Sequence, residues 1–211
     1  MQVDSAVILQ EDKKEPVKDT SIVYISKCFV GSDMTAHAFD SLVKKVNEKK
    51  PDVILFGGNL FGKHTKEVTI DKTLASIKKM KAALGIYMVE GSADSALVEE
   101  KKEKISGAGL HLLLDESAVL HNGLQLVGCR ADGKTKKPMS YTLSLINKEK
   151  PSIVLAGEAM EEKLKEEKKI SLVLYPKKIT DTGNGGTSGV NQMFPRNVLA
   201  SAKINFMQIK K

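Results

Sequence analysis

The chain has no tryptophan, few aromatic residues and only two cysteines among its 211 residues. Aromatic residues make up 5% of the sequence, which leaves little material for stacking nucleic-acid bases. Cys28 and Cys129 are too few for a disulfide scaffold or a cysteine-rich zinc site, and we interpret both as small buried side chains near strand ends. These absences argue against a nucleic-acid partner and against a disulfide-rich fold.

Long apolar runs are also missing. No stretch approaches the ~20 apolar residues needed to cross a bilayer, and residues 1–19 lack the basic-then-apolar order of a secretion signal. We therefore expect no membrane span in this chain. It is expected to be soluble as written, cytoplasmic by default, or else the soluble domain of a membrane-anchored protein.

Arginine is scarce although the formal net charge is +7. Only Arg130 and Arg196 offer the two-pronged guanidinium that suits phosphate, since the other basic residues are lysines. Most lysine clusters alternate with glutamate or lie on expected helix faces, which is typical of a solvated helix exterior. The charge therefore favours anionic partners only in a general sense.

Apolar patterning predicts an α/β protein. Strands and helices alternate up to about residue 105, and short strands follow, with a strong hairpin signal at Asn122-Gly123. The length favours one domain over residues 1–211, in which residues 1–20 form an edge strand and a charged turn. The expected strands are 3–9, 21–26, 52–56, 86–89, 112–114, 118–121, 124–128, 152–156, 170–175 and 203–209, and the expected helices are one around 39–46 and others at 71–84, 94–105, 141–147 and 158–169.

Five loops follow apolar runs and carry a recurring glycine framework. They are Ile25-Ser26-Lys27-Cys28-Phe29-Val30-Gly31, Phe56-Gly57-Gly58-Asn59-Leu60, Val89-Glu90-Gly91-Ser92-Ala93-Asp94, Leu155-Ala156-Gly157-Glu158 and residues 172–182. Their order and spacing, over roughly residues 20–209, resemble the calcineurin-like metallophosphoesterase superfamily, with its pattern S-D-x-H, G-G-D, G-N-H-[DE], a lone His and G-H-x-H. The resemblance implies a four-layer α/β/β/α sandwich of two mixed sheets flanked by helices.

The resemblance also implies a site with two metal ions about 3.5–4 Å apart, which clamp a phosphate and activate water. Here nearly every metal-binding side chain of that site is absent, although Asn59 keeps an oxygen without the charge, so the chain resembles a degenerate member. Only an aspartate that orients a histidine in the family is kept, and it now has no histidine to orient. In family order the vestigial positions are Lys27, Phe29, Asn59, Ser92, Ala93, Asp94, Gly157, Lys177 and Ile179.

No other residues restore a catalytic site, so we predict no catalytic residues, no metal ligands and no cofactor. The four histidines are scattered, at His37, His64, His111 and His121. Among loop carboxylates that could form an acid–base pair, Asp94 precedes Ser95–Val98 and fits a helix cap. The others are Asp33, Glu158 and Asp181.

The sequence therefore predicts a binding or scaffold module with an unknown protein partner or a small phosphorylated ligand. Lys27, with Lys177 or Lys178, could hold a phosphate-type anion without metal. The alternative is a divergent phosphatase or phosphodiesterase that binds divalent metal through non-standard ligands. Those ligands would come from Asn59, Asp94, Glu158 or Asp181.

Overall fold

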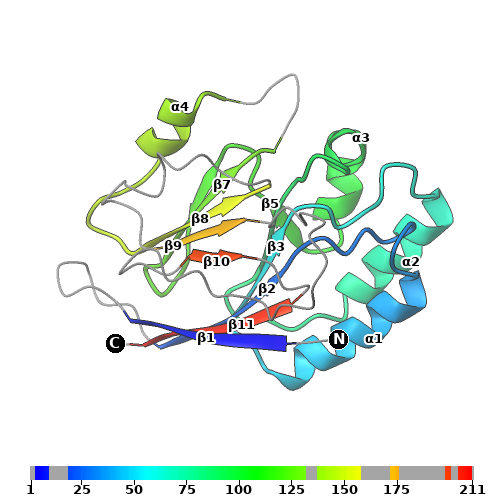
Figure 1. The fold of residues 1–211 in the computed structure, drawn as a ribbon, viewed down its shortest axis with the longest axis horizontal. Coiled ribbons are helices and arrows are strands. Elements are labelled where there is room, and N and C mark those ends of the chain that lie inside the picture. Colours follow the sequence, from blue (N-terminus) through cyan, green and yellow to red (C-terminus); the bar gives the residue numbers. More distant parts are fainter. Residues whose placement is uncertain are drawn as a thin grey trace, which may run out of the picture.

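The computed structural model describes residues 3–9, 19–131, 137–157, 172–175, 198–200 and 204–210. Within these ranges the chain forms two mixed β-sheets with helices on their outer sides (Figure 1). The expected helix at 158–169 and the charged turn before residue 19 lie outside the described residues. None of the described helices is both long and apolar enough to span a membrane.

The first sheet has six strands in the order β1-β11-β2-β3-β4-β5. Strands β2 to β5 run parallel, β11 is antiparallel to β2, and β1 lies at the edge parallel to β11. The parallel part follows from the β-α-β connections, because each crossover helix returns the chain to the same end of the sheet. The strands are β1 (Val3–Leu9), β2 (Thr20–Ile25), β3 (Val53–Gly57), β4 (Ile86–Val89), β5 (Leu110–Leu112) and β11 (Ile204–Lys210).

The second sheet has five strands in the order β10-β9-β8-β7-β6. Its first four strands are parallel, and β6 pairs antiparallel with β7 through the hairpin expected at Asn122-Gly123. Gly123 has φ +91° and its N–H donates to the Leu120 carbonyl, so glycine suits this turn. The strands are β6 (Ser117–Val119), β7 (Gln125–Cys129), β8 (Ser152–Ala156), β9 (Leu172–Tyr175) and β10 (Val198–Ala200).

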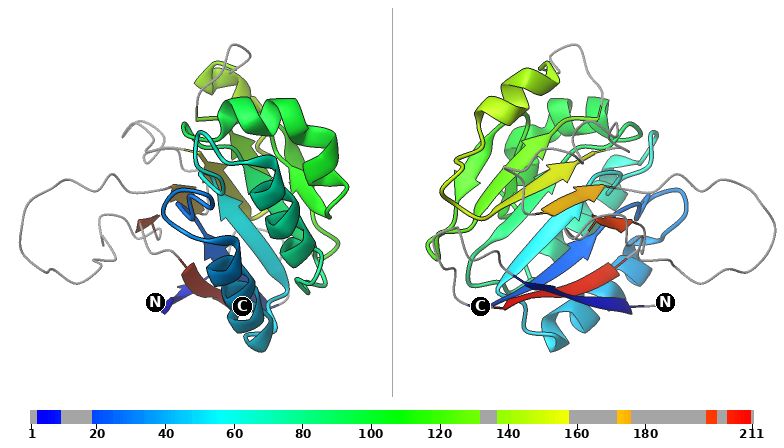
Figure 2. Two further views of the ribbon diagram at one scale, coloured as in Figure 1. Left: turned by 90° about the vertical axis from the view of Figure 1, so that its right-hand side faces the viewer. Right: turned by 60° about the vertical axis from the view of Figure 1, so that its left-hand side comes forward.

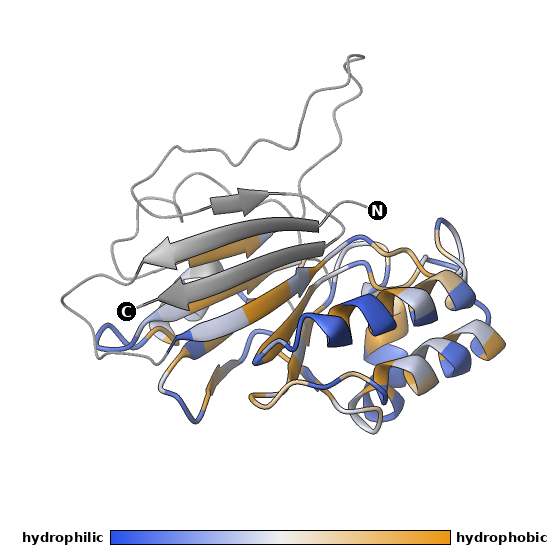
Figure 3. Ribbon diagram, turned by 90° about the horizontal axis from the view of Figure 1, so that it is seen from below, coloured by the Kyte–Doolittle hydropathy of each residue, from blue (hydrophilic) through white to orange (hydrophobic). Residues whose placement is uncertain are grey.

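Of the helices in the described part of the chain, three cover the outer face of the first sheet and one covers the second (Figure 2). Helix α1 begins where the Thr35 hydroxyl accepts the Ala38 N–H, and the apolar residues that predicted it are buried. Hydrophobic and hydrophilic faces alternate around α1 and α2 (Figure 3). The helices are α1 (Ala36–Glu48), α2 (Glu67–Ile77), α3 (Ser95–Ser106, kinked at Lys101) and α4 (Met139–Ser144).

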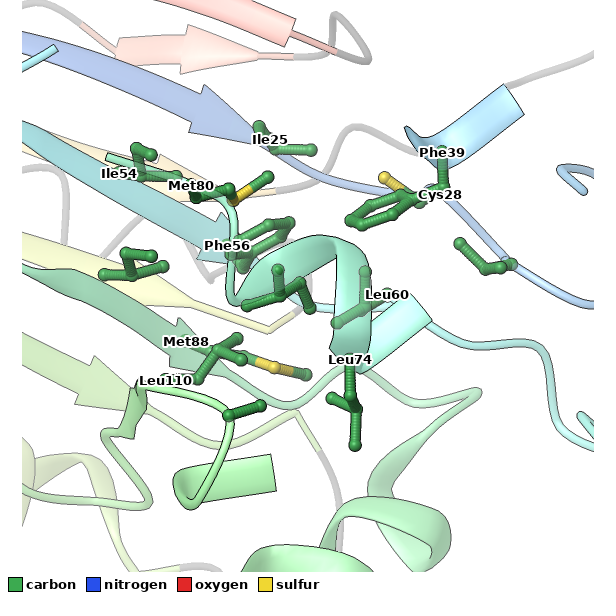
Figure 4. Close-up of a cluster of buried hydrophobic side chains, with 14 of the residues drawn as sticks. Ile25, Cys28, Phe39, Ile54, Phe56, Leu60, Leu74, Met80, Met88 and Leu110 are labelled. Atoms are coloured by element: carbon green, nitrogen blue, oxygen red, sulfur yellow. The ribbon is translucent and has the colours of Figure 1, made fainter. Parts of the chain in front are cut away.

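Buried side chains form three layers. One core lies between α1–α3 and the first sheet, where the rings of Phe39 and Phe56 are 6.4 Å apart; Figure 4 shows Ile25, Phe39 and Phe56 turned toward it. A second core joins the inner faces of the two sheets, and a third packs α4 side chains on the outer face of the second sheet. The described part of the chain is thus the α/β/β/α sandwich that the sequence predicts.

Helix α2 ends seven residues before its predicted limit at Leu84. The Asn47 side chain donates to the Lys79 carbonyl at 2.8 Å and accepts the Lys81 N–H at 2.9 Å. These bonds hold the chain in a turn after α2, and Met80 is buried in the core between α1–α3 and the first sheet. A tertiary contact from α1 therefore overrides the helical pattern of the sequence.

Candidate functional site

The loops at the carboxyl ends of β2, β3, β4, β7 and β8 form a common region, here called the carboxyl edge. It comprises residues 26–31, 57–61, 90–94, 130–131 and 157. Main-chain hydrogen bonds join its first two loops: the N–H of Lys27 donates to Gly58 at 3.1 Å, and the N–H of Phe29 donates to Asn59 at 3.0 Å. The resemblance places metal ligands on these loops, so their side chains decide what the site can do.

Three vestigial positions have left-handed backbone. Lys27, Phe29 and Asn59 have φ of +53°, +45° and +55°. Residues other than glycine rarely adopt such angles, and a bulky phenylalanine there is strained. The surrounding hydrogen bonds maintain this backbone path, although Lys27 and Phe29 cannot bind a cation and Asn59 offers only a neutral amide oxygen.

Asp94 is fully buried and acts as an internal acceptor. Its Oδ1 accepts the N–H groups of Gly91 at 2.8 Å and Asn59 at 3.3 Å, and its Oδ2 accepts the N–H of Phe61 at 3.2 Å. Asp94 lies at the N-cap of α3, as predicted, and its carbonyl accepts the Val98 N–H at 2.8 Å, but its side chain makes no cap hydrogen bond. Burial raises the pKa of Asp94 to about 6, although these backbone N–H groups act in the opposite direction.

Asn59 also joins the loop after β3 to the loop after β4. It is 5% exposed, and its Oδ1 accepts the Ala93 N–H at 2.8 Å. A side-chain carbon added at Gly91 would lie 2.5 Å from the Asn59 amide group, and one at Gly58 would lie 2.8 Å from Gly91. The glycine framework is therefore needed for loop packing, whether or not a ligand binds.

Gly157 has no room for a side chain. It follows β8, and its N–H donates to the Cys129 carbonyl at 3.0 Å. A Cβ at this position would lie 1.8 Å from the Glu90 carbonyl oxygen and 2.8 Å from the Ala131 Cβ. The main chain of Glu90 thus fills the space into which a histidine would project in the resembled family.

A buried ion pair that the sequence did not predict lies within the carboxyl edge. Arg130 donates from Nε and Nη2 to the two carboxylate oxygens of Glu90 at 2.8 and 3.0 Å, and from Nη2 to Glu99 at 2.8 Å. Burial raises the pKa of Glu90 against the opposing effect of Arg130. The guanidinium that the sequence offered for phosphate is therefore bound to protein carboxylates. The sequence carries one signal of this ion pair: Arg130, one of only two arginines in the chain, directly follows an apolar strand.

Of the residues predicted to bind an anion, Lys27 lies within the described ranges. Its side chain is half-buried, and this burial lowers the pKa of its ammonium group. Ser92 and Ala93 lie in the loop between β4 and α3, where Ala93 donates to Asn59. The remaining predicted site residues lie outside the described ranges; they are Glu158, Lys177, Lys178, Ile179 and Asp181.

The described donor set does not fit a pair of divalent cations. Among the described residues, no group of three or more His, Cys, Asp or Glu could hold a metal ion. All four histidines are exposed and lie on separate elements; they are His37, His64, His111 and His121. Cys28 and Cys129 are both buried, as predicted. The carboxylates nearest the vestigial positions, Asp94 and Glu90, are bound to backbone N–H groups and to a guanidinium.

Comparison with solved structures confirms the architecture. The structure of TT1561 from Thermus thermophilus aligns with a TM-score of 0.56 at 18% identity, over 77% of this chain and 83% of that one. A second solved structure aligns with a TM-score of 0.60 at 12% identity, over 86% of this chain and 90% of the other.

Sequence comparison, taken with these structures, indicates a metallophosphoesterase-like fold. An uncharacterised metallophosphoesterase from Helicobacter pylori is 25% identical over 189 residues, which cover 86% of this chain and 48% of the relative. The chain thus spans about half the length of the curated relative it matches. No family model matches the sequence.

Proposed function

We propose that this chain is a binding module that retains the metallophosphoesterase-like sandwich and functions without a two-metal centre. Its partner would be a protein or a small phosphorylated ligand. The observation that carries the proposal is the use of the buried carboxylates at the carboxyl edge. Asp94 accepts backbone N–H groups and Glu90 binds Arg130, so neither presents a free carboxylate to a cation.

Charge supports this reading. Two divalent cations need carboxylates and imidazoles to neutralise about four positive charges. The vestigial positions supply instead an ammonium at Lys27, a phenyl ring at Phe29 and a neutral amide at Asn59. An ammonium group repels a cation and attracts an anion, so the edge favours a phosphate-type ligand over a metal.

Metal analysis of the purified chain, combined with hydrolysis of an aryl phosphate and an aryl phosphodiester, tests the proposal. We expect substoichiometric manganese, iron and zinc and no hydrolysis above that of buffer. Near-stoichiometric metal with hydrolysis that a chelator abolishes would contradict the proposal and favour the divergent-enzyme alternative.

Inorganic phosphate and pyrophosphate test the anion component of the proposal through protection against thermal unfolding. We expect protection in the wild type that is lost in Lys27→Met. Lys148→Met is the matched control, because Lys148 is exposed and precedes β8 at the opposite end of that strand from the carboxyl edge. Equal protection of all three proteins would eliminate Lys27 as the anion ligand.

A further inference from the structure

The Glu90–Arg130 ion pair connects the two sheets of the sandwich. Glu90 directly follows β4 of the first sheet, and Arg130 directly follows β7 of the second. Both side chains are buried, with exposures of 0% and 8%. The guanidinium also binds Glu99 on α3, so a single cation contacts elements of the first sheet, the second sheet and the helix layer.

The main chain next to this ion pair packs against two vestigial ligand positions. A Cβ at Gly157, aligned with the lone histidine, would lie 1.8 Å from the Glu90 carbonyl oxygen. On the other side, a Cβ at Gly91 would lie 2.5 Å from Asn59, which aligns with the bridging aspartate. Residues 90–91 therefore lie in close contact with Gly157 and Asn59, two positions that the resemblance assigns to metal ligands.

Arg130 is fixed through its main chain as well. Its N–H donates to Asp115 Oδ1 at 3.1 Å, and Asp115 Oδ2 accepts the Lys137 N–H at 2.9 Å. Asp115 is itself buried, with φ +58°. Asp115 thus fixes the main chain from which the guanidinium extends, and the planar guanidinium loses less side-chain entropy per hydrogen bond than a lysine ammonium would.

We propose that the Arg130 guanidinium is the internal cation that joins the two sheets at the carboxyl edge, where the resembled enzymes use metal ions. The inference rests on the proposed function, because it assumes that the edge holds no metal. A buried carboxylate needs a counter-charge and hydrogen-bond donors, and the planar guanidinium supplies both to Glu90 in a two-pronged geometry. Arg130 thereby locks residues 90–94 against the second sheet without an exchangeable ion.

Thermal unfolding of Arg130→Met tests the inference against a matched control. Lys104 on α3 also contacts two carboxylates, those of Glu67 and Asp71, but its side chain is 39% exposed. We expect Arg130→Met to lower the Tm by roughly 10 °C, because Glu90 is left buried and unpaired, and Lys104→Met to lower it by roughly 2 °C. Arg130→Lys keeps the charge but loses the two-pronged geometry, so an intermediate fall is expected.

Hydrogen exchange locates the effect. We expect the amides of Gly91, Ala93 and Gly157 to exchange faster in Arg130→Lys while those of α1 do not change. If Arg130→Met matches Lys104→Met in Tm, or if the faster exchange is spread evenly over the chain, the inference is wrong. Stoichiometric bound metal would remove the proposed function without altering these Tm comparisons, so the two failures are distinguishable.

Discussion

Two aspartates show how differently this molecule uses charge in two regions. On the α1–α2 face, Asp40 accepts the Ser76 hydroxyl at 2.9 Å and the Lys79 ammonium at 2.8 Å, with its side chain 22% exposed. At the carboxyl edge, Asp94 is fully buried and accepts main-chain N–H groups from two loops. Water can replace the partners of Asp40, whereas the N–H groups around Asp94 depend on its carboxylate.

The helix face and the carboxyl edge of the sandwich are therefore stabilised in different ways. Helices α1 and α2 are attached mainly by their buried apolar faces, and the charges between them are additions. The loops of the carboxyl edge also bury apolar side chains such as Phe61, but their main chains are joined to one another by buried polar side chains. Loss of a charge should therefore be tolerated on the helix face and damaging at the edge.

The largest effect is expected from Asp94→Ala. The substitution leaves the N–H groups of Gly91, Asn59 and Phe61 buried without their acceptor, at about 1–3 kcal/mol for each. We expect the free energy of unfolding to fall by about 4 kcal/mol, measured by urea denaturation. Asp94→Asn keeps one acceptor oxygen and should lose about half as much.

Asp33→Ala is the control for that measurement. Asp33 lies in the loop before α1, is exposed, and its main-chain N–H donates to Phe29. Its replacement should change stability by less than about 0.5 kcal/mol. If Asp94→Ala were as mild as Asp33→Ala, the contrast between the two regions would not hold.

A smaller effect is expected from pH acting on the same carboxyl group. The pKa of Asp94 is raised from 3.8 to about 6 because burial disfavours its charged form. Between these values the folded state keeps a proton that the unfolded state has lost, so this contribution to stability falls as pH rises through 4 to 6, by at most about 3 kcal/mol. Urea midpoints across this window should fall less in Asp94→Asn than in the wild type; equal slopes would contradict the assignment.

Local patterns in the sequence were sufficient to predict most of the architecture. The buried stripe of α1, the apolar strand β8 and the Asn122-Gly123 hairpin each lie where the sequence predicts them. Such features depend on neighbours a few residues apart, so periodicity and turn chemistry report them. The end of α2 was missed because the Asn47 side chain, 32 residues from Lys79, determines it.

The carboxyl edge could be located from sequence but its chemistry could not. Glycines and strand ends gave the positions of the loops, since parallel strands bring their carboxyl ends together. The pairing of Glu90 with Arg130 spans 40 residues, and Asp94 meets N–H groups 33 and 35 residues away. Whether a carboxylate is available to a ligand depends on these distant partners, which no local motif records.

The smallest effect is expected at Asp40, with the opposite sign to Asp94. Its hydrogen bonds to Lys79 and Ser76 lower the pKa of Asp40 from 3.8 to about 2. Its contribution to stability is present above pH 4 and is lost as pH falls from 4 to 2, because the folded state must then accept a proton. Asp40→Asn keeps an acceptor for Ser76 but loses the charge, so its thermal midpoint should fall less than that of the wild type over this window. The difference should shrink at high salt, since water and ions reach this pair. Two results would contradict this: a difference between the two proteins that persists at high salt, or one that lies between pH 4 and 6. Either result would show that Asp40 behaves like a buried group, and the distinction between the helix face and the carboxyl edge would no longer hold.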